Sequence, residues 1–394
     1  ADFVFSDFNS THGLSFVGSS GTTTCINSSA LRYGAFQGRA DEQIGMLDVS
    51  VSEAEHAVKL VSVETSTMSD QEGTTNNRAG FGHRENATQS PDVAGERCRV
   101  RARLTPSLPS KTGAMWYSVP VPVTRGFETI FTITDQSRVC TEHMDPFFSR
   151  NMHTTCSIRG GDGLAFVLHG DPRGDSALGI VGGEMGYGGL LNSMAVELDT
   201  WYNPDSNSTD IVYDHIGVHS GGPEANNSAR EWAELAPPHQ WDLADGKHHI
   251  VKVKYYPRLA TEYLANFTAT PAVLPYLKDN GVNRRLGTIV IWVDDGVQSG
   301  SPILAIPINL SVLLNLPQDQ AYVGFTSSTG RAWAKHDIIS WYWCHNDGGQ
   351  EEDSSGSSQW DGCGSTPGFS EFSYGQTTKY FPESRVTYFA PTDT

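Results

Sequence analysis

Short runs in which apolar and polar residues alternate recur along the chain, and this pattern most constrains its fold. Successive side chains of a β-strand face opposite sides of a sheet, so alternation predicts half-buried strands. Forty Gly and twenty Pro, with no long helical period, favour strands joined by many turns. We therefore expect an all-β fold with one helix, around residues 271–280. The main expected strands lie at 2–17, 99–104, 126–134, 245–256, 286–294, 321–330 and 336–343.

Residues 195–219 concentrate side chains that bind cations. Glu197 and Asp199 are two residues apart in an alternating run, which places both carboxylates on one face of a strand. Asn203, Asp210 and His215 follow, the last opening another strand-like run. Two carboxylates and an imidazole suit a first-row transition metal, and carboxylates with amide and backbone oxygens suit calcium. Ordinary turn chemistry is the alternative for each of these residues taken singly.

The charge balance excludes some classes of partner. The formal net charge of −18 argues against nucleic acid, whose phosphates would be repelled. No apolar run of about eighteen residues exists, so we expect no membrane span. The first residue is Ala1 rather than Met, which is consistent with a removed signal peptide.

Cysteines and glycosylation sequons together predict a secreted glycoprotein. The six cysteines allow fifteen pairings, and we favour three disulfides: one closing an insertion, one local and one fixing the C-terminal extension. In that order the cysteines are Cys25 and Cys98, Cys140 and Cys156, and Cys344 and Cys363. The seven N-x-S/T sequons are at Asn9, Asn27, Asn86, Asn207, Asn226, Asn266 and Asn309.

We expect one sandwich domain over residues 1–344. Residues 34–97 are predicted to be an insertion, and 140–156 and 257–285 to be loop insertions. After Cys344 the composition shifts to Gly, Ser, Glu and Asp, so residues 345–394 are predicted to form an extension held by a disulfide.

Besides S-D-F at 6–8, five motifs, in order along the chain, resemble those of the legume-type (L-type) lectins. They are G-D-G-L-A-F-V at 161–167, G-G-E-M-G-Y at 182–187, A-V-E-L-D-T-W-Y-N at 195–203 with H-I-G-V at 215–218, Y-V-G-F-T-S-S-T-G at 322–330 and H-D-I-I-S-W-Y-W at 336–343. The resemblance covers about residues 2–33 and 98–344. It implies a concanavalin-like jelly-roll β-sandwich of antiparallel sheets, with sugar-binding loops at one end.

The resemblance also implies two metal sites that share ligands. The transition-metal site, which we expect to hold Mn²⁺, would use Glu197, Asp199, Asp210 and His215. The calcium site would use Asp199, the main-chain carbonyl of Trp201, Asn203 and Asp210. The loop from Asn203 to Asp210 is longer than in plant lectins and contains the Asn207 sequon, so a glycan there would screen the binding face.

A sugar site next to the metals is implied in the same way. Asp162 would accept hydrogen bonds from hexose hydroxyls, with Gly183 N–H and Asn203 as donors, and Trp201 would stack on a sugar face. Arg331 and Ala332 occupy the variable positions that tune specificity. The family also implies a cis peptide between Gly161 and Asp162.

Two other classes of function compete with sugar binding. A sandwich-fold glycoside hydrolase would carry E-x-D-x-x-E, but Tyr202 stands at the third acidic position, so we expect no enzyme. The second class is a structural protein, in which the lectin-like domain is a building block of an extracellular filament, wall or matrix, or forms a homo-oligomer. The insertion and the extension support this alternative. The sequence favours a secreted Ca²⁺- and Mn²⁺-dependent lectin that binds glycans or glycoproteins, with the filament as alternative.

Overall fold

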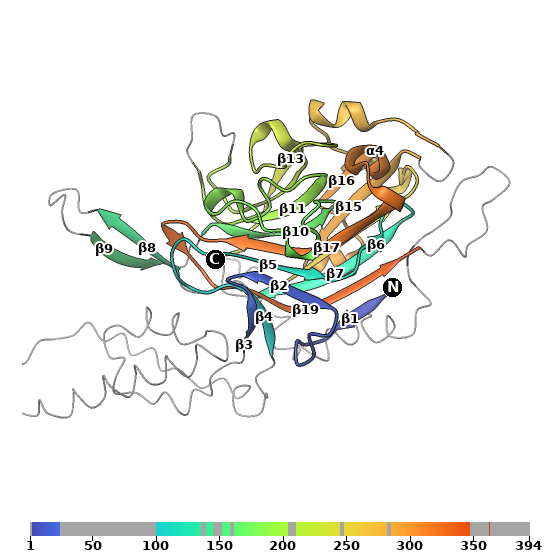
Figure 1. Cartoon of the computed structure of the whole chain (residues 1–394). Helices are drawn as coiled ribbons and strands as arrows, with labels where there is room; N and C mark the ends of the chain where they lie inside the picture. The colour runs from blue at the N-terminus through green and yellow to red at the C-terminus, as the bar shows by residue number, and fades with distance from the viewer. Residues whose placement is uncertain are drawn as a thin grey trace, which may run out of the picture.

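Two antiparallel sheets, packed face to face, form the body of the protein (Figure 1). The computed structural model describes residues 2–23, 100–134, 139–144, 152–157, 161–203, 210–244, 248–281, 285–346 and 362. The main predicted strands are present in these sheets, so the predicted all-β architecture is confirmed. Strands at 21–23 and 234–240 were not predicted.

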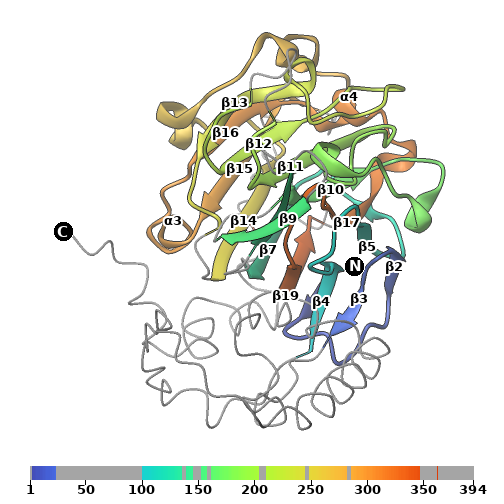
Figure 2. The same cartoon turned by 90° about the vertical axis from the view of Figure 1, so that its left-hand side faces the viewer.

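The first sheet has eight strands, several of which run side by side in Figure 2. Across the sheet they are β16 (Leu304–Ile308), β15 (Gly287–Val293), β14 (His248–Tyr256), β7 (Phe127–Thr134), β19 (His336–His345), β4 (Arg101–Thr105) and β3 (Gly21–Thr23), and β1 (Phe3–Phe5) also pairs with β19.

The second sheet also has eight strands and carries the candidate site. Across the sheet they are β13 (Glu234–Gln240), β12 (His215–His219), β11 (Ser193–Asp199), β10 (Gly163–His169), β17 (Gln320–Ser328), β5 (Thr112–Tyr117) and β2 (Leu14–Gly18), and β6 (Val121–Pro122) pairs with β17. Strands β10, β11 and β12 are buried along their whole length, which requires cover on both faces.

Aromatic and aliphatic side chains from the two sheets interlock to form the core. The ring of Phe325 in β17 lies edge-on to Phe131 and Trp341 of the first sheet, with centroids 4.9 Å apart in both pairs. On its other face the second sheet is covered by the segment 177–190. Tyr187 and Leu190 of that segment pack against Ala165 and Ala195. The second sheet is therefore enclosed on the side where the acidic residues project.

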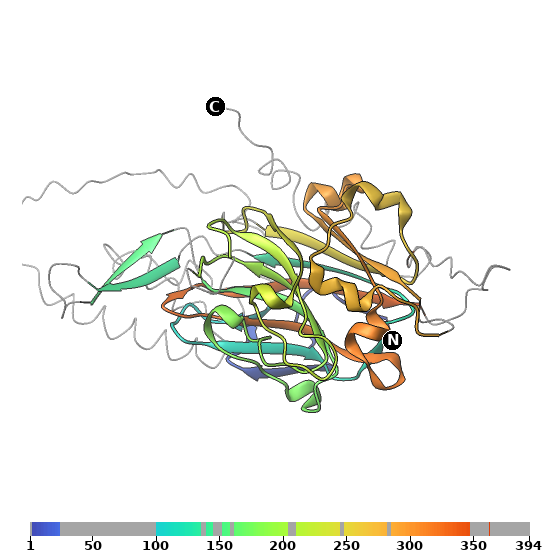
Figure 3. The same ribbon diagram turned by 90° about the horizontal axis from the view of Figure 1, so that it is seen from above.

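The segment between Cys140 and Cys156 differs from the predicted loop. Strands β8 (Val139–Met144) and β9 (Met152–Ser157) form an antiparallel hairpin in which Cys140 lies opposite Cys156. The short strand β18 (Ala332–Trp333) pairs with β8. The hairpin projects from one end of the sandwich, as Figures 1 and 3 show. Strand β18 comes from far along the chain, so local periodicity could not reveal its pairing with β8.

The single strand predicted for residues 2–17 is wrong. Bends and a turn separate β1 from β2, and these two strands belong to different sheets. Apolar residues occur on both sides of the break, because Phe3, Phe5 and Phe16 all pack against the same core from opposite sheets. Sequence periodicity alone does not distinguish one strand from two that share a core.

The predicted helix around 271–280 is a short 3₁₀ helix, η6 (Pro271–Tyr276), with Pro275 inside it. Proline lacks the N–H that an α-helix interior requires, which accounts for the difference. The α-helices of the described chain are α3 (Asp295–Ser299) and α4 (Leu310–Leu314). The other 3₁₀ helices are η2 (Gly174–Ser176), η3 (Gly182–Glu184), η4 (Glu231–Ala233), η5 (Thr261–Asn266) and η7 (Pro317–Asp319).

Asn309 cannot serve as the glycosylation acceptor that its sequon suggests. Its side chain is fully buried, donates to the carbonyl of Lys278 at 2.6 Å and accepts from the N–H of Ser311 at the start of α4. A glycan would displace this helix cap. Asn9 and Asn226 are exposed and Asn266 is half-buried. Asn27, Asn86 and Asn207 lie outside the described residues.

Several other predicted features also fall outside the described residues. These are the insertion 34–97, the extension beyond 346 apart from Gly362, and the cysteines at 25, 98 and 363. Cys344, at the end of β19, is buried and disulfide-bonded. Its pairing with Cys363 stays a prediction.

Candidate metal centre and adjoining binding site

Adjacent strands β11 and β12 bring the predicted metal ligands together on the outer face of the second sheet. Asp199 lies directly across from His215, and Glu197 lies across from Gly217. The intervening residues Leu198 and Ile216 point into the core between the sheets. Period-2 geometry thus separates core residues from polar ones along each strand.

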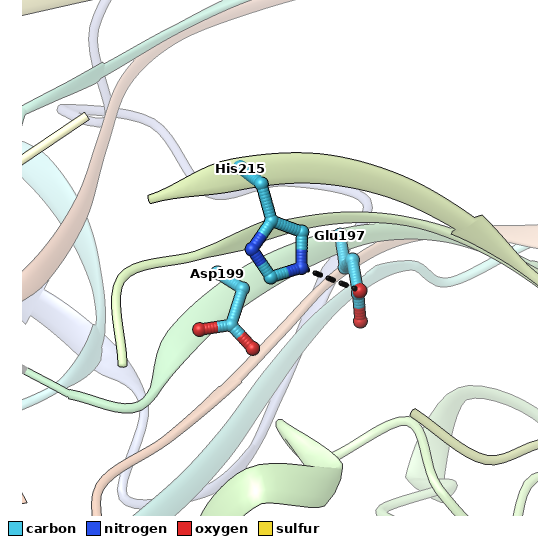
Figure 4. A group of neighbouring side chains, drawn as sticks. All are labelled: Glu197, Asp199 and His215. Atoms are coloured by element: carbon cyan, nitrogen blue, oxygen red, sulfur yellow. Dashed lines mark ion pairs between the residues drawn. The ribbon is translucent and has the colours of Figure 1, made fainter. Parts of the chain in front are cut away.

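Glu197, Asp199 and His215 form a buried group in which each can contribute one ligand atom within 4.8 Å of the others. Figure 4 shows the imidazole of His215 beside both carboxylates, with its Nε2 3.5 Å from Glu197 Oε1. The three side chains are 5% exposed or less. Buried carboxylates and an imidazole that converge in this way could hold a metal ion.

The loop after β11 adds the remaining predicted ligands. The N–H of Trp201 donates to Asp199 Oδ1 at 2.6 Å, and the N–H of Asn203 donates to Asp210 Oδ2 at 2.6 Å. Asp210 Oδ1 lies 3.7 Å from His215 Nδ1. Of the six predicted metal-binding residues, five line the same cavity: Glu197, Asp199, Asn203, Asp210 and His215. The connecting residues 204–209 lie outside the described part of the chain.

The pKa values in this group are shifted because the carboxylates of Glu197, Asp199 and Asp210 lie close to buried imidazoles. Burial, together with the charges of Glu197 and Asp210, raises the pKa of Asp199 well above its usual value. Burial lowers the pKa of His215, but Glu197 and Asp199 outweigh it and the result is a pKa of about 10. For Glu197, burial raises the pKa, and His219 and His215 reverse the effect, so that it falls below its ordinary value. The converging carboxylates therefore favour a positively charged group between them, either protonated His215 or a bound cation.

A cavity of about 150 Å³ opens beside these ligands. It is lined by Glu197, Asp199, Asn203, Asp210, His215 and His219, by Gly183 and Glu184, and by residues of the segment 229–238. The side chain of Glu184 accepts hydrogen bonds from Ser228 Oγ at 3.1 Å and from the N–H of Ala229 at 3.0 Å. Glu184 thereby connects the segment that follows β10 to the far wall of the cavity.

Asp162 lies at the start of β10, and the peptide bond between Gly161 and Asp162 is cis, as predicted. Its backbone N–H donates to Ser328 at 2.9 Å and its carbonyl accepts from Thr200 at 3.1 Å, so the backbone is fixed between two strands. The carboxylate is 4% exposed, and burial raises its pKa to about 7. Among the described residues its Oδ2 has no hydrogen-bond partner.

The other predicted sugar-binding residues lie around Asp162 and the metal ligands. A Cβ added at Gly183 would lie 2.7 Å from Asn203 Oδ1, and one added at Gly161 would lie 3.1 Å from the Cβ atoms of both Trp201 and Ala332. The absence of a side chain at Gly161 and Gly183 lets these two segments approach the loops that carry Trp201, Asn203 and Ala332. Arg331 is exposed, whereas Ala332 is buried, so of the two variable positions only Arg331 presents its side chain to solvent.

Sequence reasoning missed two residues that contact Glu197. His219 Nε2 lies 2.8 Å from Glu197 Oε1, and the hydroxyl of Tyr187 donates to Oε2 at 2.5 Å. His219 was detectable, because it lies four residues beyond His215 in an alternating run and so on the same strand face. No local pattern identifies Tyr187, which reaches Glu197 only when the 177–190 segment folds over the sheet.

Residues 102–359, more than half of the chain, match the family model for the legume lectin domain. The chain belongs to the legume lectin domain family. Every predicted metal-binding and sugar-binding residue lies within the matched range. The two-sheet sandwich is the jelly-roll of this family, and the chain contains a lectin domain, which is a carbohydrate-binding type of domain.

Two curated relatives are plant receptor kinases. The L-type lectin-domain containing receptor kinase SIT1 of Oryza sativa subsp. japonica is 27% identical over 189 residues, which cover 45% of this lectin and 23% of the kinase. The putative L-type lectin-domain containing receptor kinase I.10 of Arabidopsis thaliana is 28% identical over 193 residues, covering 47% and 26%. This lectin thus spans only about a quarter of the length of the curated relatives it matches.

Similar solved structures include a plant lectin and a lumenal domain. The lectin from Bauhinia forficata in complex with GalNAc is 15% identical, with 88% of this chain and 99% of that chain covered and a TM-score of 0.43. The exoplasmic/lumenal domain of VIP36 in its Ca²⁺/Man3GlcNAc-bound form is 19% identical, with 65% and 82% covered and a TM-score of 0.39. Within the described residues no helix is long and apolar enough to cross a membrane.

Proposed function

We propose that this lectin binds neutral glycans in a Ca²⁺- and transition-metal-dependent manner, at a site made by Asp162, Gly183 and Asn203 over the metal ligands. The observation that carries the proposal is the buried Asp162 carboxylate, whose Oδ2 has no hydrogen-bond partner among the described residues. A buried acceptor without a partner is costly, and a sugar hydroxyl is a donor that would satisfy it.

The metal ligands divide into two sets that share Asp199 and Asp210. Glu197 and His215 complete a set suited to Mn²⁺, because borderline and hard divalent ions accept mixed carboxylate and imidazole ligands. Trp201 O and Asn203 complete an all-oxygen set suited to Ca²⁺. Bound cations would neutralise the crowded carboxylates and fix the orientation of the Asn203 amide.

Sugar recognition then depends on fixed hydrogen-bonding groups rather than on charge. The Asp162 carboxylate accepts from two hydroxyls, and the Gly183 N–H and the Asn203 amide donate to sugar oxygens. Trp201 offers an apolar ring to a sugar face. Arg331, exposed in the loop after β17, is our choice for the residue that selects among sugars.

We further propose that the protein acts outside the cytoplasm, as a secreted or cell-surface lectin. The VIP36 structure is of an exoplasmic/lumenal domain, and exposed Asn9 and Asn226 are accessible to glycan transfer. The sequon at Asn207 lies between Asn203 and Asp210, so a glycan there would stand close to the sugar site. No observation on the described residues favours the alternative of a filament-forming building block.

A glycan array tests this proposal through Asp162. We expect the unmodified lectin to bind a subset of neutral glycans and Asp162→Asn to lose that binding by at least about 100-fold, because an amide cannot replace a carboxylate that accepts from two hydroxyls. Asp242→Asn, at an exposed position outside the site, is the matched control and should bind normally. Equal binding by the Asp162→Asn variant would contradict the proposed sugar site.

A further inference from the structure

Both oxygens of the metal ligand Glu197 are already held by side chains that are not themselves in the metal-binding group. Tyr187 donates to Oε2 at 2.5 Å, and His219 Nε2 lies 2.8 Å from Oε1. Tyr187 is fully buried and His219 is 4% exposed, so both contacts are largely shielded from bulk solvent.

We propose that Tyr187 and His219 are positioning residues that hold Glu197 in its metal-binding orientation and thereby raise the affinity of the site for its transition metal. This inference rests on the proposed function, because it assumes that Glu197 is a metal ligand. It assigns roles to two residues outside the predicted ligand sets.

The sequence of β12 makes room for this arrangement. Gly217 lies directly across from Glu197, between His215 and His219 on the same strand face. A Cβ at Gly217 would lie 2.7 Å from Glu197 Oε1 and 2.9 Å from His219 Nε2, closer than a Cβ atom approaches other heavy atoms. Glycine therefore leaves the space in which the Glu197 carboxylate lies between the two imidazoles.

Geometry distinguishes His219 from a metal ligand. The ligand atoms that lie within 4.8 Å of one another belong to Glu197, Asp199 and His215. His219 contacts the same Glu197 oxygen as His215 does, but at 2.8 Å rather than 3.5 Å, a hydrogen-bond distance. If Nε2 carries the proton, His219 donates to the carboxylate while His215 is left to bind the metal through its own Nε2.

Tyr187 reaches the site from a different part of the chain. It belongs to the 177–190 segment, which covers the outer face of β10 and β11, and it packs in the cluster containing Met185 and Leu190. Glu184 of the same segment is hydrogen-bonded to the segment around Ala229. The covering segment is therefore fixed at several points, which holds the Tyr187 hydroxyl at a constant position relative to β11.

Outer groups that hydrogen-bond to metal ligands commonly change metal affinity by about 10- to 100-fold, because an unsupported ligand must be ordered when the ion binds. We expect Tyr187→Phe and His219→Leu each to weaken Mn²⁺ binding by a factor in that range. His219→Gln, whose amide can donate at a similar position, should recover most of the affinity.

Calorimetric titration of the metal-free lectin with Mn²⁺ tests the proposal. The matched control is Tyr255→Phe, because Tyr255 is also fully buried but its hydroxyl contacts the backbone of Ile308 and Leu310 rather than the site. We expect this variant to keep the unmodified Mn²⁺ affinity. Thermal unfolding of the metal-free variants separates a general loss of stability from a specific loss of affinity.

The outcomes separate this proposal from the proposed function. If the unmodified lectin binds Mn²⁺ and Tyr187→Phe and His219→Leu bind it within about 2-fold, the positioning role fails and the metal site stands. If the unmodified lectin binds no Mn²⁺, both fail. X-ray absorption of the Mn²⁺ complex that shows two imidazole ligands would also overturn the positioning role, since His219 would then be a ligand itself.

Discussion

At the residue scale, most of the candidate site was predictable because its members are close in sequence or carry a family motif. Glu197, Asp199 and His215 follow from strand periodicity. The role of Tyr187 was not predictable, because its contact with Glu197 depends on how a glycine-rich segment folds over the sheet. The burial of Asn309 was hidden for a similar reason, since its amide caps α4 and bonds to Lys278 across 31 residues.

Asp162 gives a prediction about pH. Burial raises its pKa from 3.8 to about 7, so between these values the folded state holds a proton that the unfolded state has released. A raised pKa contributes stability that is full below the unfolded value and is lost as the pH rises through the folded value. Relative to Asp162→Asn, the metal-free lectin should lose on the order of 4 kcal/mol of unfolding free energy between about pH 4 and about pH 8.

Urea unfolding of both proteins across this range measures the difference directly. A difference that stays constant with pH would mean that Asp162 is ionised throughout and that solvent reaches its carboxylate. Protonation of Asp162 also predicts that glycan affinity falls as the pH drops through the pKa of this carboxyl in the metal-loaded lectin, because the protonated carboxyl accepts from fewer hydroxyls.

At the element scale, one face of β12 packs in the core and the other face lines the candidate site. Alternation predicted this division, because Ile216 and Val218 are apolar and His215 and His219 are polar. The pairing of β8 with β18 and the division of residues 2–17 between two sheets were not predictable, since each depends on contacts between distant parts of the chain.

Two substitutions in neighbouring positions of β12 test the division. Gly217→Ala should displace Glu197 and weaken Mn²⁺ binding by at least about 10-fold, because its Cβ would overlap the carboxylate. Val218→Ala, on the core face, should lower the free energy of unfolding by about 2 kcal/mol and leave Mn²⁺ affinity unchanged. Titration calorimetry and urea unfolding of both variants give the two quantities. Loss of metal affinity in Val218→Ala, together with unchanged affinity in Gly217→Ala, would contradict the register of β12 against β11.

At the scale of the whole molecule, the sandwich forms a rigid support for loops that supply the binding groups. The excess of acidic residues, with a net charge of −18, is compatible with the proposed binding of cations and neutral sugars. The alternating runs predicted the strands, because each strand must bury one face, and the family resemblance implied their arrangement in two sheets. The pattern weakens in the insertion at 34–97, which lies outside the described residues.

The central claim is that cations organise a sugar site beside Asp162. The most direct test measures binding of the lectin to its best array glycan before EDTA treatment, after it, and after Ca²⁺ and Mn²⁺ are restored. We predict that EDTA abolishes binding and that the two ions together restore it, because the Asn203 amide and the surrounding loop lose their fixed orientation without them. Full binding in EDTA, by a chain shown by elemental analysis to be free of metal, would contradict the account.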